Sequence, residues 1–198
     1  MSDITRRDAL QRLALAFAVA GVVDPADART AHQAAQDAGR AAGGSYAPRA
    51  LSVREFATLD RLTDLILPAD GDKPGAKQAE VAAWIDTMLA VSDPLKARYT
   101  AGLAWIDAAM ARRGAKDFAS AEAAQQTALL DVIAFRKNRT PEHEAGVDFF
   151  VLLRRMTCDG FYTSAIGMRD VYVGNAPQAS FTVPQAAIDH VLSRSPLK

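Results

Sequence analysis

Apolar residues recur at helical spacing through most of the chain between residues 52 and 162. Successive segments carry them at intervals of three and four, which places them on one face of an α-helix. These segments cover residues 52–67, 81–90, 92–113, 120–139 and 140–162. The positions expected to face the core are Val53, Phe56, Leu59, Leu62, Ile66, Val81, Trp84, Ile85, Met88, Leu89, Leu95, Tyr99, Leu103, Ile106, Met110, Val147, Phe149, Phe150, Leu152, Leu153 and Met156, with Ala124, Leu129, Val132, Ile133 and Phe135 as the apolar content of the fourth segment. We predict an all-α fold, with a single compact helical domain of about five or six helices over residues 51–198 and an irregular C-terminal arm from about residue 164.

Local signals mark where these helices begin and end. Ser52 and Glu55 match a capping box, in which each side chain pairs with the backbone N–H of the other residue. Residues 68–75 are rich in proline, glycine and aspartate and therefore predict a loop. Gly114 is expected to end the helix before it, and residues 140–142 are expected to cap the last long helix.

The N-terminus has the order of an export signal. Arg6 and Arg7 are followed by an apolar run over residues 13–23 and by the sequence A-x-A at residues 26–28. Paired arginines, a short apolar run and a small-residue site are typical of a signal for the twin-arginine route. We therefore predict a twin-arginine signal peptide over residues 1–28. The alternative is an ordinary amphipathic first helix.

Residues 29–50 are rich in alanine, glutamine and glycine and have little apolar periodicity. This composition predicts a linker, helical in part, between the signal and the helical domain. His32 lies in this stretch and is expected to be solvated.

The stretch over residues 157–175 differs from the plain amphipathic pattern before it. Glycines alternate there with aromatic residues, and both residue types favour shaped contact surfaces. One interpretation is a surface that binds a partner; the other is an arm folded onto its own helices. The candidate partner-binding residues are Gly160, Phe161, Tyr162, Thr163, Ser164, Gly167, Tyr172, Gly174 and Asn175. After them, Phe181 and a short helix with Ile188, Val191 and Leu192 are expected to lie along the domain.

Composition and charge exclude several classes of protein. The chain has 198 residues, of which 49% are hydrophobic, as in an ordinary globular domain. Lysine plus arginine and aspartate plus glutamate number 23 each, so the net charge is zero. Nucleic-acid binding depends on concentrated basic charge, so we expect no nucleic acid as a partner.

Catalytic motifs are absent from the sequence. No GxGxxG, GxxxxGK[ST], GxSxG or HExxH pattern occurs, and the histidines are scattered. The single cysteine, Cys158, excludes an internal disulfide, a four-cysteine cluster and a CxxCH haem attachment. Its thiol is expected to be buried, whereas an unpaired cysteine in an oxidising compartment also suggests an intersubunit disulfide. We expect no catalytic residue, metal or cofactor in this chain.

Two parts of the chain resemble the gluconate 2-dehydrogenase subunit 3 family. Residues 56–90, FATLDRLTDLILPADGDKPGAKQAEVAAWIDTMLA, are similar to that family's leucine-rich helix, I-x-P-A-D and P-G-A loop, and following helix with I-D. Residues 149–175, FFVLLRRMTCDGFYTSAIGMRDVYVGN, are similar to its G-[FY]-[YF]-T-S-x-I-G and Y-x-G-N ending. The resemblance covers about residues 52–175. Cys158 departs from the pattern, in which an apolar residue is usual, and no cysteine follows Phe181.

The resemblance implies a small accessory subunit of a periplasmic, FAD-dependent sugar or sugar-acid dehydrogenase. The catalytic partner, of the glucose–methanol–choline oxidoreductase type, would hold the FAD, and a cytochrome c with haem c would accept the electrons. The small subunit would assist the maturation of that partner and lend it a twin-arginine signal. The YVGN ending is most similar to members paired with glycoside 3-dehydrogenases.

The function that follows is a non-catalytic subunit in a heterodimer or larger complex. It would be periplasmic, exported by the twin-arginine translocase, and associated with the membrane through the complex. The alternatives are a stand-alone periplasmic helical ligand-binding protein and a small enzyme. A subunit should be unstable or oligomeric alone, a binding protein should be a stable monomer, and an enzyme should turn over substrate without a flavoprotein.

Overall fold

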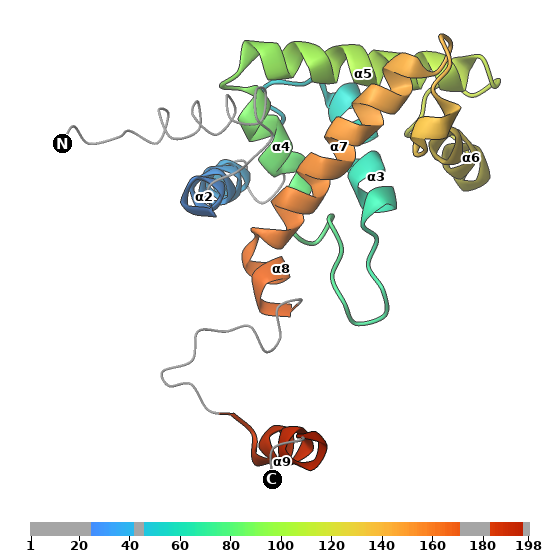
Figure 1. The fold of residues 1–198 in the computed structure, drawn as a ribbon. Coiled ribbons are helices and arrows are strands. Elements are labelled where there is room, and N and C mark those ends of the chain that lie inside the picture. Colours follow the sequence, from blue (N-terminus) through green and yellow to red (C-terminus); the bar gives the residue numbers. More distant parts are fainter. Residues whose placement is uncertain (1–24, 42–45, 171–182, 196–198) are drawn as a thin grey trace.

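The computed structural model describes residues 25–41, 46–170 and 183–195, which form helices and their connections (Figure 1). The helices are α2 (Pro25–Ala41), α3 (Val53–Ile66), α4 (Val81–Leu89), α5 (Asp93–Ala111), α6 (Ala123–Ile133), the 3-10 helix η1 (Arg136–Asn138), α7 (Glu144–Tyr162), α8 (Ala165–Asp170) and α9 (Gln185–Arg194). Within these ranges, β pairing is limited to an isolated bridge between Asp70 and Lys73. The predicted all-α fold is confirmed.

Helix α4 lies at the centre of the core. All nine of its residues are buried, and α2, α3, α5 and α7 each contact it. Its sequence, VAAWIDTML, contains a single charged side chain, Asp86, and therefore has no polar face to present to water. Helix α7 crosses the bundle diagonally in Figure 1 and contacts α3, α4, α5 and α6 along its length.

The predicted core positions in α4, α5 and α7 are all buried, as expected. In α3, Leu59 and Leu62 are fully buried, and Phe56 and Ile66 pack partly against the core. The prediction for Val53 is wrong, because this side chain is 78% exposed. Val53 is the first residue of α3, so the apolar stripe continues for a turn beyond the packed part of the helix.

The predicted helix starts agree with the structure at α3 but not at α6 and α7. The capping box of α3 is confirmed: the Ser52 N–H donates to Glu55 Oε2 at 2.8 Å, and the Glu55 N–H donates to Ser52 Oγ at 3.3 Å. Helix α7 instead begins at Glu144, and the residues expected to cap it form a turn closed by the Glu144 N–H on Thr140 O at 2.8 Å. Helix α6 likewise begins at Ala123, later than predicted.

The loop between α3 and α4 is closed by backbone hydrogen bonds at its tip and at its base. Asp70 and Lys73 exchange both backbone hydrogen bonds, at 3.0 and 2.9 Å, around a turn in which Gly71 has a φ of +57°. The Ala76 N–H donates to Leu67 O at 2.8 Å. The loop signal in residues 68–75 is therefore confirmed, and the loop is an ordered projection from the bundle (Figure 1).

The stretch over residues 29–50, predicted as a linker that is helical in part, packs on the core in its helical part. Residues 25–41 form helix α2, in which Ala31 and Ala35 are buried at successive turns. Their small side chains let α2 lie close to α4, which it contacts. Alanines contrast little in hydropathy with the polar residues around them, so apolar periodicity does not mark this face as a packing surface.

Helix α9 does not pack as expected. None of its residues is buried, and Ile188, Val191 and Leu192 are 37%, 65% and 65% exposed. The expectation that this helix lies along the domain is therefore wrong for the residues that the structure describes. Phe181 lies outside the described residues.

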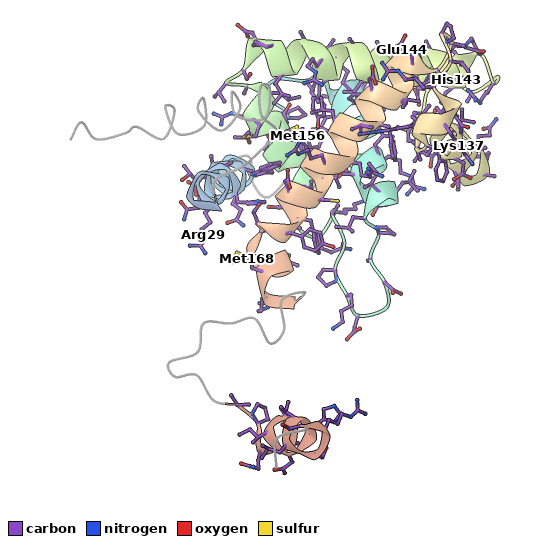
Figure 2. The ribbon with its side chains drawn as sticks, in the orientation of Figure 1. Arg29, Lys137, His143, Glu144, Met156 and Met168 are labelled. Atoms are coloured by element: carbon purple, nitrogen blue, oxygen red, sulfur yellow. The ribbon has the colours of Figure 1, made fainter. Side chains whose placement is uncertain are left out.

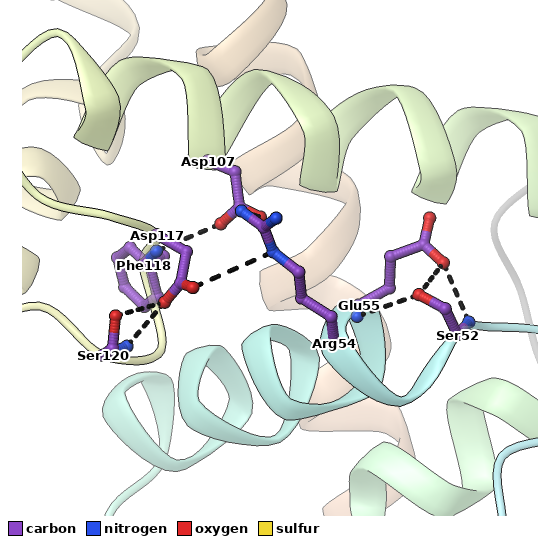
Figure 3. A network of polar contacts seen from close by, with 7 residues as sticks. All are labelled: Ser52, Arg54, Glu55, Asp107, Asp117, Phe118 and Ser120. Atoms are coloured by element: carbon purple, nitrogen blue, oxygen red, sulfur yellow. Dashed lines mark hydrogen bonds and ion pairs between the residues drawn. The ribbon is translucent and has the colours of Figure 1, made fainter.

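A polar network joins α3, α5 and the connection between α5 and α6 (Figure 3). Arg54 Nη2 lies 3.2 Å from Asp107 Oδ2, and Arg54 Nε lies 3.8 Å from Asp117 Oδ2. Asp107 Oδ1 accepts the Phe118 N–H at 3.0 Å, and Asp117 Oδ1 accepts the Ser120 N–H at 2.9 Å. These bonds fix the connection that leads into α6.

Candidate partner-binding site

The candidate site begins where α7 ends and turns into α8. The Thr163 N–H donates to Asp159 O at 3.1 Å, which closes the last turn of α7. Ser164 then serves both helices, because its Oγ–H donates to Phe161 O at 2.7 Å while its Oγ accepts the Gly167 N–H at 3.0 Å. A serine at this place therefore fixes the angle at which the chain leaves α7.

Two glycines of this segment are required by the packing of the chain itself. A Cβ on Gly160 would lie 2.8 Å from Cε3 of Trp84 and 3.1 Å from Cγ1 of Val81, so α7 rests directly on α4 there. A Cβ on Gly167 would overlap the backbone carbonyl of Phe161. Each glycine allows a close approach that any larger residue would prevent.

The structure therefore corrects part of the predicted partner-binding surface. Gly160, Phe161, Ser164 and Gly167 are buried within the fold, with Phe161 at 2% and Ser164 at 4% exposure. For these four, the alternative of an arm folded onto its own helices holds. Tyr162 and Thr163 are half-buried, and Tyr172, Gly174 and Asn175 lie outside the described residues.

His32 belongs to this site, although the sequence indicated a solvated side chain. The residue is 9% exposed, and its ring stacks on Trp84 with centroids 5.5 Å apart. Its Nε2 lies 3.2 Å from Thr163 Oγ1, across 131 residues of sequence. Burial lowers the pKa of His32 from 6.5 to about 4, although a hydrogen bond with the Gly160 backbone raises it in part. His32 is therefore neutral at pH 7 and joins α2 to the end of α7.

A groove of about 350 Å³ lies between α2 and α8, beside His32. Arg29 on α2 and Met168 on α8 flank it (Figure 2), and the Met168 side chain is 43% exposed. Gln33, Gln36, Thr163 and Ala165 complete its lining. Its polar and small side chains suit a contact surface.

Asp86, like His32, is a buried polar residue that the sequence does not mark as important, apart from its place in the I-D pattern. Its carboxylate is fully buried on α4 and accepts hydrogen bonds from the segment before α3. The donors are the N–H of Arg49 at 2.7 Å, the N–H of Leu51 at 2.9 Å and the Tyr46 hydroxyl at 2.8 Å. A buried carboxylate satisfied in this way anchors a loop. Its role is therefore structural.

Cys158 is half-buried on α7, so the expected buried thiol is found only in part. Burial, and to a smaller extent the Asp159 carboxylate, raise the pKa of its thiol above the ordinary value of 9.0. A raised pKa lowers the thiolate fraction at neutral pH and slows thiol chemistry. The candidate intersubunit disulfide remains a prediction.

Other chemistry is not assembled in the described part of the chain. No group of three or more metal-ligating side chains comes together there. None of the helices described is both long and apolar enough to span a bilayer. Arg6 and Arg7 of the predicted export signal lie outside the described residues.

The fold and this site define a class of protein: an all-helical domain whose unusual residues hold its helices together and shape its surface grooves. Comparison with known families gives the identity. The family described as gluconate 2-dehydrogenase subunit 3 matches residues 53–179, and the chain belongs to this family. It is thereby an accessory subunit that associates with the catalytic subunit of a dehydrogenase. No curated protein and no solved structure shows a significant match.

Proposed function

We propose that this chain is the non-catalytic small subunit of a periplasmic, FAD-dependent sugar dehydrogenase complex. It binds the flavoprotein of the glucose–methanol–choline type, assists its maturation and carries it through the twin-arginine pathway. The family match over residues 53–179 carries this proposal. The Y-x-G-N ending further favours a glycoside 3-dehydrogenase as the catalytic partner, with a cytochrome c as electron acceptor.

The export role is supported by the order of features at the N-terminus. Arg6 and Arg7 precede an apolar run, and residues 25–41 then form helix α2, docked on the core through Ala31 and His32. The twin-arginine route carries folded proteins, so a partner without a signal could travel bound to this chain. Association of the complex with the membrane would then come from the cytochrome.

The partner-binding role is proposed for the half-buried and C-terminal members of the predicted surface. Thr163 lines the groove between α2 and α8, and Tyr162 precedes it as the last residue of α7. Tyr172, Gly174 and Asn175 follow α8 in sequence. Tyrosines at interfaces often contribute most of the binding energy. Tyr172→Ala should therefore weaken the complex without changing the melting temperature of the isolated subunit.

The test of the proposed function is export of the partner. The full chain, as wild type or with Arg6→Lys and Arg7→Lys together, is co-expressed with the FAD-dependent dehydrogenase subunit that we expect to be encoded beside it. Cell fractionation should show both proteins in the periplasm with the wild type and both in the cytoplasm with the variant. An exported, active flavoprotein in the absence of this chain would contradict the proposal and favour a stand-alone ligand-binding protein.

A further inference from the structure

The corner that joins α6 to α7 exposes residues of the kind that concentrate binding energy at interfaces. Phe135 follows the buried end of α6 and is 53% exposed, although aromatic side chains of its size are usually buried. Arg136 and Lys137 come next in η1, and Lys137 Nζ lies 5.3 Å from the centroid of the Phe135 ring. Figure 2 shows Lys137 at this corner, and His143 and Glu144 near the start of α7.

The corner is held rigidly by hydrogen bonds on both sides. Asn138 Nδ2 donates to Val132 O at 2.8 Å, and the Asn138 N–H donates to Phe135 O at 3.0 Å. Arg139 Nη2 bonds Glu144 Oε1 at 2.7 Å and Asp148 Oδ2 at 3.0 Å, which ties the corner to α7. A surface ordered before binding loses less entropy when a partner arrives.

On one side of the corner lies a basic groove of about 460 Å³, between α5 and α7. Arg98, Arg136 and Arg139 line it, and Val147 and Val151 form its apolar part. The charge of Arg139 is matched by Glu144 and by Asp148, the acidic residue of the lining. Among the described residues, Arg98 and Arg136 have no such ion pair, so their guanidinium groups are available to a partner. The three arginines outnumber the two carboxylates around the groove by one.

On the other side of Phe135 lies an apolar groove of about 350 Å³, between the ends of α3 and α6 and the middle of α7. Leu65, Ile66, Leu130, Ala134, Phe135 and Phe150 supply its apolar surface. Asp131 and Arg154 also line it, with opposite charges. The corner therefore separates a groove suited to apolar side chains from one suited to carboxylates.

We propose that this corner is a docking surface for a segment of the dehydrogenase catalytic subunit that carries carboxylates beside an apolar residue. Aspartate or glutamate side chains would pair with Arg98 and Arg136, whose planar guanidinium groups bind carboxylates in two-point contacts. The apolar residue would fill the groove beside Phe135. This inference rests on the proposed function, because it takes the catalytic subunit as the partner.

Charge complementarity selects this occupant over others. Whatever covers the basic groove must bring negative charge to two guanidinium groups across a surface lined by valine, which a peptide with mixed acidic and apolar side chains provides. Asp131, Glu144 and Asp148 around the same corner limit the negative charge that fits there to one or two carboxylates, whereas a nucleic-acid backbone carries a charge on every phosphate. The corner and α8 lie at opposite ends of α7, about 27 Å apart along a helix of 19 residues. The two surfaces can therefore be tested separately.

The test measures binding of the purified full chain to the FAD-dependent dehydrogenase subunit that we expect to be encoded beside it, at low and at high salt. Phe135→Ser should weaken binding by about 30-fold, the effect of losing an interface hot spot. Arg98→Ser with Arg136→Ser should weaken it by about 10-fold at low salt and by less at 0.5 M NaCl, as expected for partly exposed ion pairs. Matched controls are Val53→Ser, an exposed apolar residue on α3, and Lys73→Ser with Lys96→Ser, which remove the same charge elsewhere.

Each outcome decides between the hypotheses. If the wild type binds the partner and the corner variants change the affinity by less than about twofold, with unchanged melting temperatures, the docking surface is overturned. The proposed function is then left intact. Absence of wild-type binding defeats the proposed function itself. Corner variants could instead convert a homo-oligomer to monomers in size-exclusion chromatography and still bind the flavoprotein normally. That result would assign the corner to contact with a second copy of this chain and overturn the inference.

Discussion

The imidazole of His32 stacks on the indole of Trp84, with ring centroids 5.5 Å apart and planes inclined by 23°. This contact joins α2, which precedes the family-matched residues, to the fully buried centre of the core. His32 also faces Thr163, so one side chain links the start of the described chain to the end of α7. The docking of α2 therefore depends on a neutral histidine.

The first prediction is that α2 undocks at acid pH. The folded-state pKa of His32, about 4, lies below its ordinary value of 6.5, so the docked state binds fewer protons between these pH values. The contribution of neutral His32 to the stability of the docked state is complete above about pH 6.5. It is lost as the pH falls towards 4, by up to roughly 3 kcal/mol. Hydrogen exchange of α2 amides at pH 7 and pH 4.5 measures it. His32→Phe keeps a ring on Trp84 and should remove this pH dependence; equal dependence in both proteins would contradict the assignment.

The second prediction concerns the buried carboxylate of Asp86. Asp86→Asn places amide hydrogens against backbone N–H donors of Arg49 or Leu51 and should lower the free energy of unfolding by about 2–4 kcal/mol. Tyr46→Phe removes one donor and leaves the others, so its cost should be about 1 kcal/mol. Urea unfolding of both variants measures the difference. Equal costs would show that the backbone bonds to Asp86 contribute little.

The third prediction distinguishes packing from partner binding at Gly160. Gly160→Ala puts a Cβ 2.8 Å from the Trp84 ring and should destabilise the isolated subunit by about 1–3 kcal/mol. Affinity for the partner, measured per folded molecule, should not change. Trp84→Phe offers a smaller ring and should recover part of the loss in a double-mutant cycle. A normal melting temperature with weakened partner binding would restore Gly160 to the interface.

The fourth prediction concerns acid stability at the network in Figure 3. Hydrogen bonds from the Ser120 hydroxyl and N–H, with a smaller contribution from Arg54, hold the pKa of Asp117 below its ordinary value of 3.8. A lowered carboxylate pKa stabilises the fold above the unfolded pKa, and this stability is lost as the pH falls through the folded value. Ser120→Ala should therefore lower the free energy of unfolding at pH 5. It should also make the free energies of unfolding at pH 5 and pH 2 more alike than they are in the wild type. Urea midpoints at both pH values provide the measurement, with Ser193→Ala on α9 as the control.

The fifth prediction is that Cys158 remains a slow-reacting thiol. Its half-buried position and raised pKa oppose both thiolate formation and disulfide exchange. Titration of the native protein with a thiol reagent at pH 7 should be slow, and become fast after unfolding in urea. Non-reducing electrophoresis of the purified complex provides the second measurement. A band at the summed mass that disappears in Cys158→Ser would establish the intersubunit disulfide instead.

The sequence by itself determined which segments are helical and which faces of the central helices are buried. Leu59, Tyr99 and Leu153 each belong to an apolar stripe that follows the helical period within its own segment. Burying such a stripe is the main source of helix stability in proteins. The capping box of Ser52 and Glu55 was equally predictable, because its bonds join residues three positions apart. The loop motifs likewise carried the family resemblance, which the match over residues 53–179 confirms.

Only the tertiary structure decided what the residues of the candidate site do. Whether Gly160 serves a partner or the core depends on Trp84 of another helix, and no local pattern contains that distance. His32 lies in an alanine-rich segment that hydropathy treats as a linker, yet it is buried by residues up to 131 positions away. Asp86 is acidic, but it is buried because the donors of residues 46–51 converge on it. Burial of a polar group depends on partners brought together by the whole fold, and helical periodicity describes only one element at a time.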